Sequence, residues 1–409
     1  MEGGKLRSLK DKIIGIEFNS TYESTSQPIN ESANQPIISK EEVMAKKGGY
    51  GFGIVGCGMI ADFHARAIEG MKGGHLACVF SRSKANADRV AKDFNCASYQ
   101  NYKAFLAHPG LDIVAIATPS GAHLEPCVQA AKAGKHIICE KPLDVTLERV
   151  DRMIRACDEN RVMLAGIFPR RFNEATTVFK RAVDTGRLGK ITLADAYIKW
   201  HRTQEYYDSG DWRGTWLLDG GGALMNQSIH TIDLLFHLAG EVASVCAYAD
   251  CAIHEGIETE DNAVAIVKFK SGALGVIEGS TSCFSPTGHP AEVHMCGADG
   301  SIFMRDNAFT VWDFKKKKPS DQKIMQKFRA ETGKAGAGAA DPRAIDFSGH
   351  QKNFEDAVRS LKGGKKPLID GKEARKSIEI ILAVYSSALT GGKPVRLPLK
   401  RTPLRKSFR

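Results

Sequence analysis

The sequence predicts an α/β protein in which a domain with a parallel β-sheet precedes a domain built on a large, mainly antiparallel sheet. Short apolar segments alternate with amphipathic helical segments from Tyr50 to about residue 165, which is typical of β-α-β units. Beyond that point the apolar segments lengthen, and turn signals such as KSGAL and CGADG join them directly. We therefore divide the chain into an extension (1–45), a parallel-sheet domain (46–165), an antiparallel-sheet domain (166–399) and a basic tail (400–409).

The individual elements follow from these patterns. Residues 1–43 are polar and aperiodic, so we expect them to be disordered, with Met44 as the true or alternative start. A Gly/Ala-rich stretch at 331–343 predicts a loop. In the first domain we expect strands at 50–56, 75–81, 111–119, 136–142 and 162–167, and helices at 59–73, 84–94, 123–134 and 147–160. In the second we expect strands at 191–202, 242–253, 262–270, 272–284, 291–300 and 301–307, a helix at 223–235, and closing helices at 350–364 and 372–392.

Composition narrows the class of protein. The net charge of +10 is concentrated in Lys315–Lys318, in Lys362–Lys366 and in the tail. Such runs favour solvated surface, with an anionic-ligand site as the alternative. No aromatic residues are interleaved with them, which disfavours nucleic acid. The ten cysteines form no CxxC pair and no zinc spacing, which indicates reduced thiols and no metal site. No apolar run reaches the ~20 residues of a membrane span, and a signal peptide is missing, so we expect a cytoplasmic protein.

The segment GCGMIA, Gly56 to Ala61, directly follows a predicted strand and opens a predicted helix. This arrangement fits the dinucleotide fingerprint GxGxxG/A, in which glycines make the turn and let the backbone approach the pyrophosphate. The sequence therefore predicts a Rossmann domain that binds NAD(P), with contacts from Gly56, Gly58, Met59 and Ile60. The second strand ends at Ser81, Arg82 and Ser83 without an acid, which slightly favours NADP over NAD.

A second motif, CEKP, ends a buried strand at Cys139 to Pro142. Ligands of open α/β sheets bind at this edge, so Glu140 and Lys141 are expected beside the nicotinamide. Lys141 can stabilise negative charge on a substrate oxygen. In the run DGGGALMNQSIHTIDLL, Asn226 and His230 stand one helical turn apart on one face. His230 suits proton transfer near neutral pH, and Asn226 can bond a sugar hydroxyl. Asp233 either orients a neighbouring group or bonds backbone.

Several segments together resemble the Gfo/Idh/MocA oxidoreductases, the family of glucose–fructose oxidoreductase and inositol dehydrogenase. They are GIVGCGMIADFH, IATPSGAH, GKHIICEKPL, WRGTW and GGGALMNQSIHTIDLL, and the resemblance spans roughly residues 44–400. It implies a Rossmann domain, an α/β domain whose open sheet often forms oligomer contacts, and hydride transfer between nicotinamide and a sugar-like hydroxyl or ketone. It further implies a homodimer or homotetramer.

The resemblance also assigns residues. Lys141 matches the family's catalytic lysine and His230 its proton carrier. Asn226 departs from inositol dehydrogenase-like members, which have Asp there; an amide cannot accept a proton as a carboxylate can. Arg171 is an expected substrate contact. The cofactor contacts implied by the resemblance are Thr118, Pro119, Ser120 and His123 in one loop and Trp212 and Arg213 in another.

We therefore predict an NAD(P)-dependent sugar or nucleotide-sugar oxidoreductase, with aromatic and charged residues at 200–216 suited to stacking on a sugar or nucleobase. Two alternatives remain open. One is an NAD-dependent glycosidase that works by transient oxidation. The other is a non-catalytic sensor of the Gal80 type, which keeps the cofactor site and uses the cleft for binding.

Overall fold

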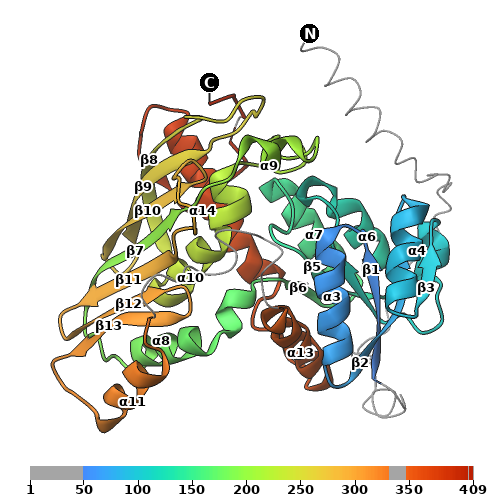
Figure 1. The fold of residues 1–409 in the computed structure, drawn as a ribbon, viewed down its shortest axis with the longest axis horizontal. Helices are drawn as coiled ribbons and strands as arrows, with labels where there is room; N and C mark the ends of the chain where they lie inside the picture. The colour runs from blue at the N-terminus through green and yellow to red at the C-terminus, as the bar shows by residue number, and fades with distance from the viewer. Residues whose placement is uncertain (1–48, 331–346, 404, 409) are drawn as a thin grey trace, which may run out of the picture.

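The computed structural model describes residues 49–330, 347–403 and 405–408, and shows two lobes that each contain a β-sheet (Figure 1). The expected disorder of residues 1–43 and the expected loop at 331–343 lie outside the described residues. None of the helices in the described ranges is long and apolar enough to cross a membrane.

The first lobe confirms the predicted Rossmann arrangement. Its six strands are all parallel and run in the order β3-β2-β1-β4-β5-β6. The central strand β1 contains two tightly packed glycines. A Cβ on Gly51 would lie 1.6 Å from the carbonyl oxygen of Gly110, and a Cβ on Gly53 would lie 2.6 Å from the ring of Phe105. Elements of this lobe are β1 (Tyr50–Val55), α3 (Met59–Gly70), β2 (Gly74–Phe80), α4 (Lys84–Asp93), β3 (Ala97–Tyr99), α5 (Tyr102–Leu106), β4 (Ile113–Ile116), η1 (Ser120–Ala122), α6 (Leu124–Lys132), β5 (His136–Cys139), α7 (Leu147–Glu159) and β6 (Leu164–Gly166).

The second lobe is built on an eight-stranded sheet in the order β13-β12-β11-β7-β10-β9-β8-β14. Only the β7–β10 pair is parallel, so the sheet is mainly antiparallel as predicted. Two of its strands, β13 and β14, were not among the predicted ones. Elements of this lobe are η2 (Pro169–Phe172), α8 (Glu174–Asp184), β7 (Ile191–Lys199), α9 (Gln204–Asp208), η3 (Ala223–Ser228), α10 (Ile229–Ala239), β8 (Val242–Asp250), β9 (Asn262–Phe269), β10 (Leu274–Ser280), β11 (Ala291–Gly297), β12 (Gly300–Arg305), β13 (Ala308–Phe314), α11 (Pro319–Lys327) and β14 (Val395–Arg396).

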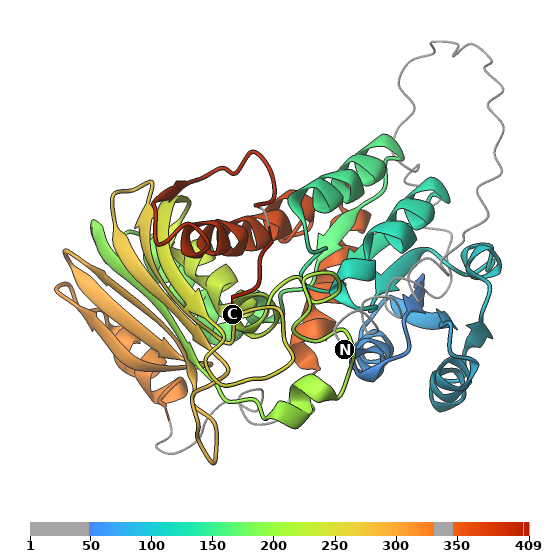
Figure 2. The same cartoon turned by 90° about the horizontal axis from the view of Figure 1, so that it is seen from above.

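Two helices late in the chain connect the lobes. α13 (Ser348–Lys362) lies beside α3 in Figure 1, and its Phe354 packs edge-on against Phe52 of β1 with the ring centroids 5.6 Å apart. α14 (Gly371–Ala388) lies between the two sheets when the molecule is seen from above (Figure 2). Part of the segment that the sequence analysis assigns to the second domain therefore covers the Rossmann sheet.

The basic tail packs across both lobes, although the sequence pattern favours a solvated run. The hydroxyl of Thr402 accepts a hydrogen bond from Leu147 N, and the guanidinium of Arg405 donates to the carbonyl oxygens of Val145 and Trp216. Phe408 packs against the Trp216 ring with the centroids 5.7 Å apart. Lys400, Arg401 and Lys406 stay exposed. We call the tail a strap, in which Arg405 bonds to both lobes and these three basic side chains remain exposed.

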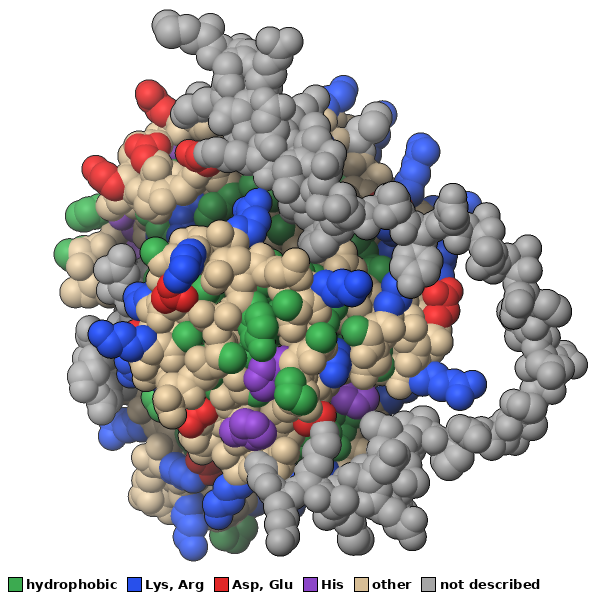
Figure 3. Space-filling model, turned by 90° about the vertical axis from the view of Figure 1, so that its right-hand side faces the viewer, with side chains coloured by type: hydrophobic (Ala, Val, Ile, Leu, Met, Phe, Trp, Pro, Cys, Tyr) green, Lys and Arg blue, Asp and Glu red, His purple; other side chains and the backbone are tan. Residues whose placement is uncertain are grey.

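The remaining basic runs lie on the surface, as expected. Lys315–Lys318 are exposed between β13 and α11, and Lys315 pairs with Asp299 at 3.3 Å. On the face of the first lobe, Lys and Arg side chains are spread among acidic and polar ones (Figure 3). All ten cysteines are free thiols.

Candidate active site

The predicted phosphate-binding turn has the required geometry. Gly56 has φ of +97°, and a Cβ there would lie 2.8 Å from the carbonyl oxygen of Ala117, so only glycine fits without strain. A Cβ on Gly58 would meet no atom within 4 Å, and α3 begins directly after it without a side-chain cap. Met59 is exposed and Ile60 half-buried. The open helix N-terminus is therefore available to an anion.

The end of β2 presents the loop Ser81–Ser83. Arg82 is exposed, and no acid stands at these three positions. Ser83 has a structural task, because its Oγ accepts a hydrogen bond from Asn86 N and thereby caps α4. Ser83 N in turn donates to Ser81 Oγ at 3.2 Å. Ser81 and Ser83 therefore both take part in local hydrogen bonds, and the exposed Arg82 lies between them in the chain.

The loop after β4 lies against the loop after β5, and His123 joins them. Its Nε2 lies 2.8 Å from the carbonyl oxygen of Thr118, and its Nδ1 lies 3.0 Å from that of Pro142. Because His123 is 1% exposed, its ring holds the two loops together and is not on the surface that a cofactor could contact. Thr118 and Pro119 are half-buried, and Ser120 is 9% exposed.

Glu140 and Lys141 lie on a hydrogen-bonded support. Oε1 of Glu140 accepts a hydrogen bond from His64 Nε2 at 2.8 Å and lies 3.5 Å from His350 Nε2. Burial raises the pKa of Glu140, but the bonds from His350 and His64 dominate and hold it well below its ordinary value. Its Oε2 accepts the backbone N–H of Lys141. The carboxylate thereby fixes the backbone that carries Lys141.

His64, Glu140 and His350 also have the composition of a metal site, with possible ligand atoms within 4.8 Å of one another. Metal-binding histidines almost always donate their second ring N–H to a partner. Nδ1 of His64 and Nδ1 of His350 have no partner among the residues that the structure describes. We therefore interpret the trio as a hydrogen-bonded cluster.

The glycine run places Asn226 and His230 together. Glycine is required at 222, where a Cβ would lie 1.7 Å from the carbonyl oxygen of Glu260. The chain then forms one π-helical turn, η3, which leads into α10. From Asp219 to Phe236, Asn226 and His230 are the two residues that are not buried. The spacing predicts that they share one face, and we call this half-buried surface the open face.

Lys141 meets this face. Its Nζ donates to the backbone carbonyl of Asn226 at 2.8 Å. Burial lowers the pKa of Lys141, and the carboxylates of Glu140 and Asp219 oppose that effect. Burial together with the nearby Lys141 and Arg170 cations lowers the pKa of His230 well below its ordinary value, so its imidazole is neutral near pH 7. The three predicted catalytic residues therefore lie together in the structure.

Asp219 is a site residue that the sequence analysis passed over. It is 2% exposed, and its Oδ1 accepts a hydrogen bond from Asn226 Nδ2 at 2.8 Å. Its Oδ2 accepts Gly214 N at 2.9 Å. Burial raises its pKa to about 7. Its position directly before the three glycines was the available signal.

Arginines and aromatic rings alternate beside the open face. The Arg213 guanidinium lies 4.1 Å from the Tyr206 ring centroid and donates to the Tyr206 hydroxyl at 2.6 Å. It also lies 4.6 Å from the Trp212 centroid. Arg202 lies 5.3 Å from the Trp200 centroid and donates to Gln227 Oε1. Trp212 and Arg213, the predicted cofactor contacts of this segment, are half-buried.

The neighbouring arginines at 170 and 171 have different surroundings. Arg171 is 3% exposed and forms a bidentate ion pair with Asp233 at 2.7 and 2.8 Å and a further bond to Glu373. The structure therefore places Arg171, an expected substrate contact, inside the second lobe. Arg170 is half-buried, lies 5.8 Å from the Trp200 ring and acts electrostatically on His230. Sequence alone could not separate two adjacent arginines in the segment PRRF.

Comparison with known proteins agrees with this architecture. Residues 50–168 match the oxidoreductase family with an NAD-binding Rossmann fold, GFO_IDH_MocA, and residues 177–303 match the GFO/IDH/MocA C-terminal domain. The WlbA dehydrogenase from Bordetella pertussis, solved in complex with NADH and UDP-GlcNAcA, is 31% identical, with a TM-score of 0.78. The alignment covers 87% of this chain and 99% of that one.

The chain belongs to the GFO/IDH/MocA family. It is an NAD-dependent oxidoreductase with a Rossmann domain followed by the family's C-terminal domain. Two curated members of the family are similar over most of their length. The scyllo-inositol 2-dehydrogenase (NAD(+)) of Bacillus subtilis is 28% identical over 357 residues, which are 85% of this chain and 96% of that protein. The myo-inositol 2-dehydrogenase of Thermotoga maritima is 26% identical over 352 residues, 82% and 95% of the two chains.

Proposed function

We propose that this GFO/IDH/MocA protein oxidises a hydroxyl group of a sugar or nucleotide sugar, with Lys141 and His230 as the catalytic residues. The observation that carries the proposal is the shared open face, where Asn226 and His230 alone remain accessible along a buried run and Lys141 Nζ contacts the same helix. This face belongs to the second lobe and is turned toward the carboxyl ends of the Rossmann strands, where dinucleotides bind.

Each side chain has a defined task in the proposed reaction. The neutral imidazole of His230 takes the proton of the substrate hydroxyl. The ammonium of Lys141, held by the carbonyl of Asn226, donates a hydrogen bond to the same oxygen and stabilises the alkoxide that forms. Nicotinamide, when bound, supplies the acceptor for the carbinol hydride. In the reverse direction Lys141 polarises the ketone and His230 returns the proton.

The residues of the first lobe fit a dinucleotide. The uncapped N-terminus of α3, with open space above Gly58, suits a pyrophosphate. We propose further that the Ser81–Ser83 loop admits NADP as well as NAD and slightly favours NADP, because Arg82 can pair with a 2′-phosphate and no acid in the loop repels it.

The substrate class follows from the arginines beside the site. Arg170 and Arg213 are half-buried, as are the rings of Tyr206 and Trp212, whereas Arg202 (4% exposed) and Trp200 (5% exposed) are buried and pack against them. Guanidinium groups recognise phosphate and carboxylate, and the rings stack on a sugar or base. The similar WlbA structure contains UDP-GlcNAcA. We therefore propose an anionic sugar, and a nucleotide sugar in preference to a neutral polyol.

A panel assay tests this function. The purified chain is incubated with NAD⁺ or NADP⁺ and with UDP-GlcNAcA, UDP-GlcNAc or scyllo-inositol, and formation of reduced cofactor is followed. We expect oxidation of an anionic member of the panel, with a loss of about 10³-fold in Lys141→Met and in His230→Ala. Unchanged turnover in both variants would refute the assignment. Sugar release from a glycoside without net reduced cofactor supports the glycosidase alternative instead.

We also propose that the chain forms a homo-oligomer through the face of the second sheet that no described helix covers. α10 and α14 lie on one side of this sheet, toward the Rossmann lobe (Figure 2). The strand positions that point away from these helices carry large apolar side chains that are 46–73% exposed: Leu193, Tyr248, Val264, Ile266 and Leu274. Such an apolar patch is typical of an interface, and a second copy is the occupant that we propose. Light scattering of Ile266→Glu is expected to give a smaller assembly than wild type; an unchanged mass contradicts this interface.

The compartment is a further part of the proposal. Ten free thiols suit a reducing environment, so we place the protein in the cytoplasm. Fractionation of cells that express the tagged chain tests this location.

A further inference from the structure

The strongest unassigned group beside the proposed site is the buried carboxylate of Asp219. It stands at the start of the glycine run and is held from two sides, by Gly214 N at 2.9 Å and by Asn226 Nδ2 at 2.8 Å. The first bond fixes the carboxylate to the loop that carries Trp212 and Arg213. The second reaches one of the two accessible residues of the open face.

The bond to Asp219 decides which way the Asn226 amide points. An ionised carboxylate only accepts hydrogen bonds, so it faces the Nδ2 end of the amide. Oδ1 of Asn226 is consequently directed away from Asp219. Position 226 therefore presents a hydrogen-bond acceptor, which suits a substrate hydroxyl that donates. Without the carboxylate, the amide could rotate and present a donor.

Asp219 also acts on the lysine. Its negative charge raises the pKa of Lys141 against the lowering effect of burial. Lys141 in turn is bonded to the backbone carbonyl of Asn226. One carboxylate therefore influences both the orientation of Asn226 and the protonation of Lys141, although it lies seven residues before Asn226 in the chain.

We propose that Asp219 is a positioning residue of the hydride-transfer site, which orients the Asn226 amide toward the substrate hydroxyl and keeps Lys141 protonated. This inference rests on the proposed function. Asp219 acts through Asn226 and Lys141 and has no direct contact with substrate in this scheme.

The protonation of Asp219 is consistent with such a role. Burial is the largest influence and raises its pKa to about 7, while the bond from Gly214 N and the charges of Lys141 and Arg213 lower it. Ionised Asp219 is the form that orients Asn226, so kcat/KM should rise as the pH increases through about 7. The charged or titratable groups that face Asp219 are Lys141, Arg213, Tyr206, Tyr207 and Tyr385.

A charge swap tests the inference. Asp219→Asn lets the amide of Asn226 turn, and Asn226→Asp places two carboxylates in one hydrogen bond; each is expected to lower kcat/KM by about 30-fold. In the double variant D219N/N226D, the amide at 219 donates to the carboxylate at 226 and still accepts Gly214 N. We expect the double variant to regain activity to within about fivefold of wild type.

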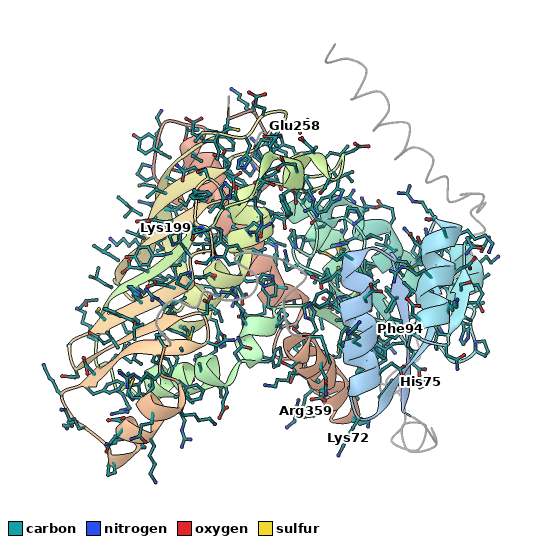
Figure 4. The ribbon with its side chains drawn as sticks, viewed as in Figure 1. Lys72, His75, Phe94, Lys199, Glu258 and Arg359 are labelled. Carbon is teal, nitrogen blue, oxygen red and sulfur yellow. The ribbon has the colours of Figure 1, made fainter. Side chains whose placement is uncertain are left out.

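The matched control is Glu258→Gln. Glu258, labelled in Figure 4, accepts Trp216 N at 2.8 Å and so holds the same loop without touching Asn226. We expect its kcat/KM and its pH profile to stay close to wild type. In Asp219→Asn, by contrast, the rise near pH 7 should disappear. The inference is wrong if the decrease in kcat/KM of the double variant equals the product of the decreases in the two single variants. It is also wrong if the pH profile of Asp219→Asn equals that of wild type.

A second readout separates this inference from the proposed function. If UDP-GlcNAcA, UDP-GlcNAc and scyllo-inositol are all left unoxidised, the proposed function fails. The effect of Asp219 is then measured by NMR titration of Lys141 after reductive ¹³C-methylation, with Lys141→Arg to assign the signal. We expect Asp219→Asn to lower the pKa of this amine, because the carboxylate that favours its charged form is removed. An unchanged pKa overturns the charge effect of Asp219, whatever the substrate.

Discussion

The ion pair between Arg171 and Asp233 gives the sharpest test of how the second lobe is stabilised. Both side chains are 1% exposed, and the pair is bidentate at 2.7 and 2.8 Å. Breaking one partner of a buried pair costs about 3–5 kcal/mol, because the remaining charge is uncompensated. In Asp233→Asn, Arg171 keeps its bond to Glu373, which is 24% exposed. We therefore expect a loss near the lower limit, about 3 kcal/mol.

The assay is urea unfolding of Asp233→Asn followed by tryptophan fluorescence. Arg171→Met/Asp233→Leu is expected to recover most of the loss, since replacing a buried pair by apolar side chains is often neutral. The control is Arg305→Met, which removes an exposed partner of Glu292 and should cost less than about 1 kcal/mol. If Asp233→Asn unfolds like wild type while Arg171→Met raises the KM for substrate, Arg171 belongs to the substrate site after all, and the reasoning from burial fails.

Three further predictions concern other regions. Burial raises the pKa of Glu260 to about 7. Because the unfolded chain ionises at a lower pH, the free energy of unfolding should fall as the pH rises from about 4.5 to 7, by about 3 kcal/mol for this group. Glu260→Gln should remove this part of the pH dependence when unfolding is measured across the range. Deleting residues 400–409 removes the bonds of Arg405 to Val145 and Trp216 and should lower stability by about 2–3 kcal/mol in the same assay; an unchanged midpoint shows that the strap contributes nothing. Arg82→Ala should raise the KM for NADP⁺ about tenfold more than that for NAD⁺ in steady-state kinetics, and equal effects on both cofactors contradict the proposed phosphate contact.

Local patterns predicted much of this molecule. The segment GCGMIA identified the dinucleotide turn, because the strand, the turn and the helix are all written within a dozen residues. The i, i+4 spacing singled out Asn226 and His230, which are both half-buried within an otherwise buried run. These signals depend on neighbours in the chain, which a sequence displays directly.

Contacts between distant segments were not predictable in the same way. Arg171 bonds Glu373 from 202 positions away, and Arg405 reaches Val145 from 260. Nothing beside Arg171 in the sequence shows that it is neutralised by α10 and α14, whereas its neighbour Arg170 stays near the site. Asp219 was missed for a related reason. Its importance depends on a π-helical turn that brings Asn226 back onto it.

The contact between α13 and the Rossmann lobe has a consequence for biosynthesis. Phe354, Ala357 and Val358 of α13 complete the apolar core on one side of the first sheet, together with Phe52, Ile54 and Ile68. These partners are separated by about 300 residues of chain, so the ribosome makes nearly the whole protein before the cover exists. Domains usually fold in order of synthesis. Here the first lobe waits with an uncovered apolar face until the last quarter of the chain emerges. We expect the isolated segment 46–168 to aggregate when it is expressed without α13, which makes the nascent chain a natural client for chaperones.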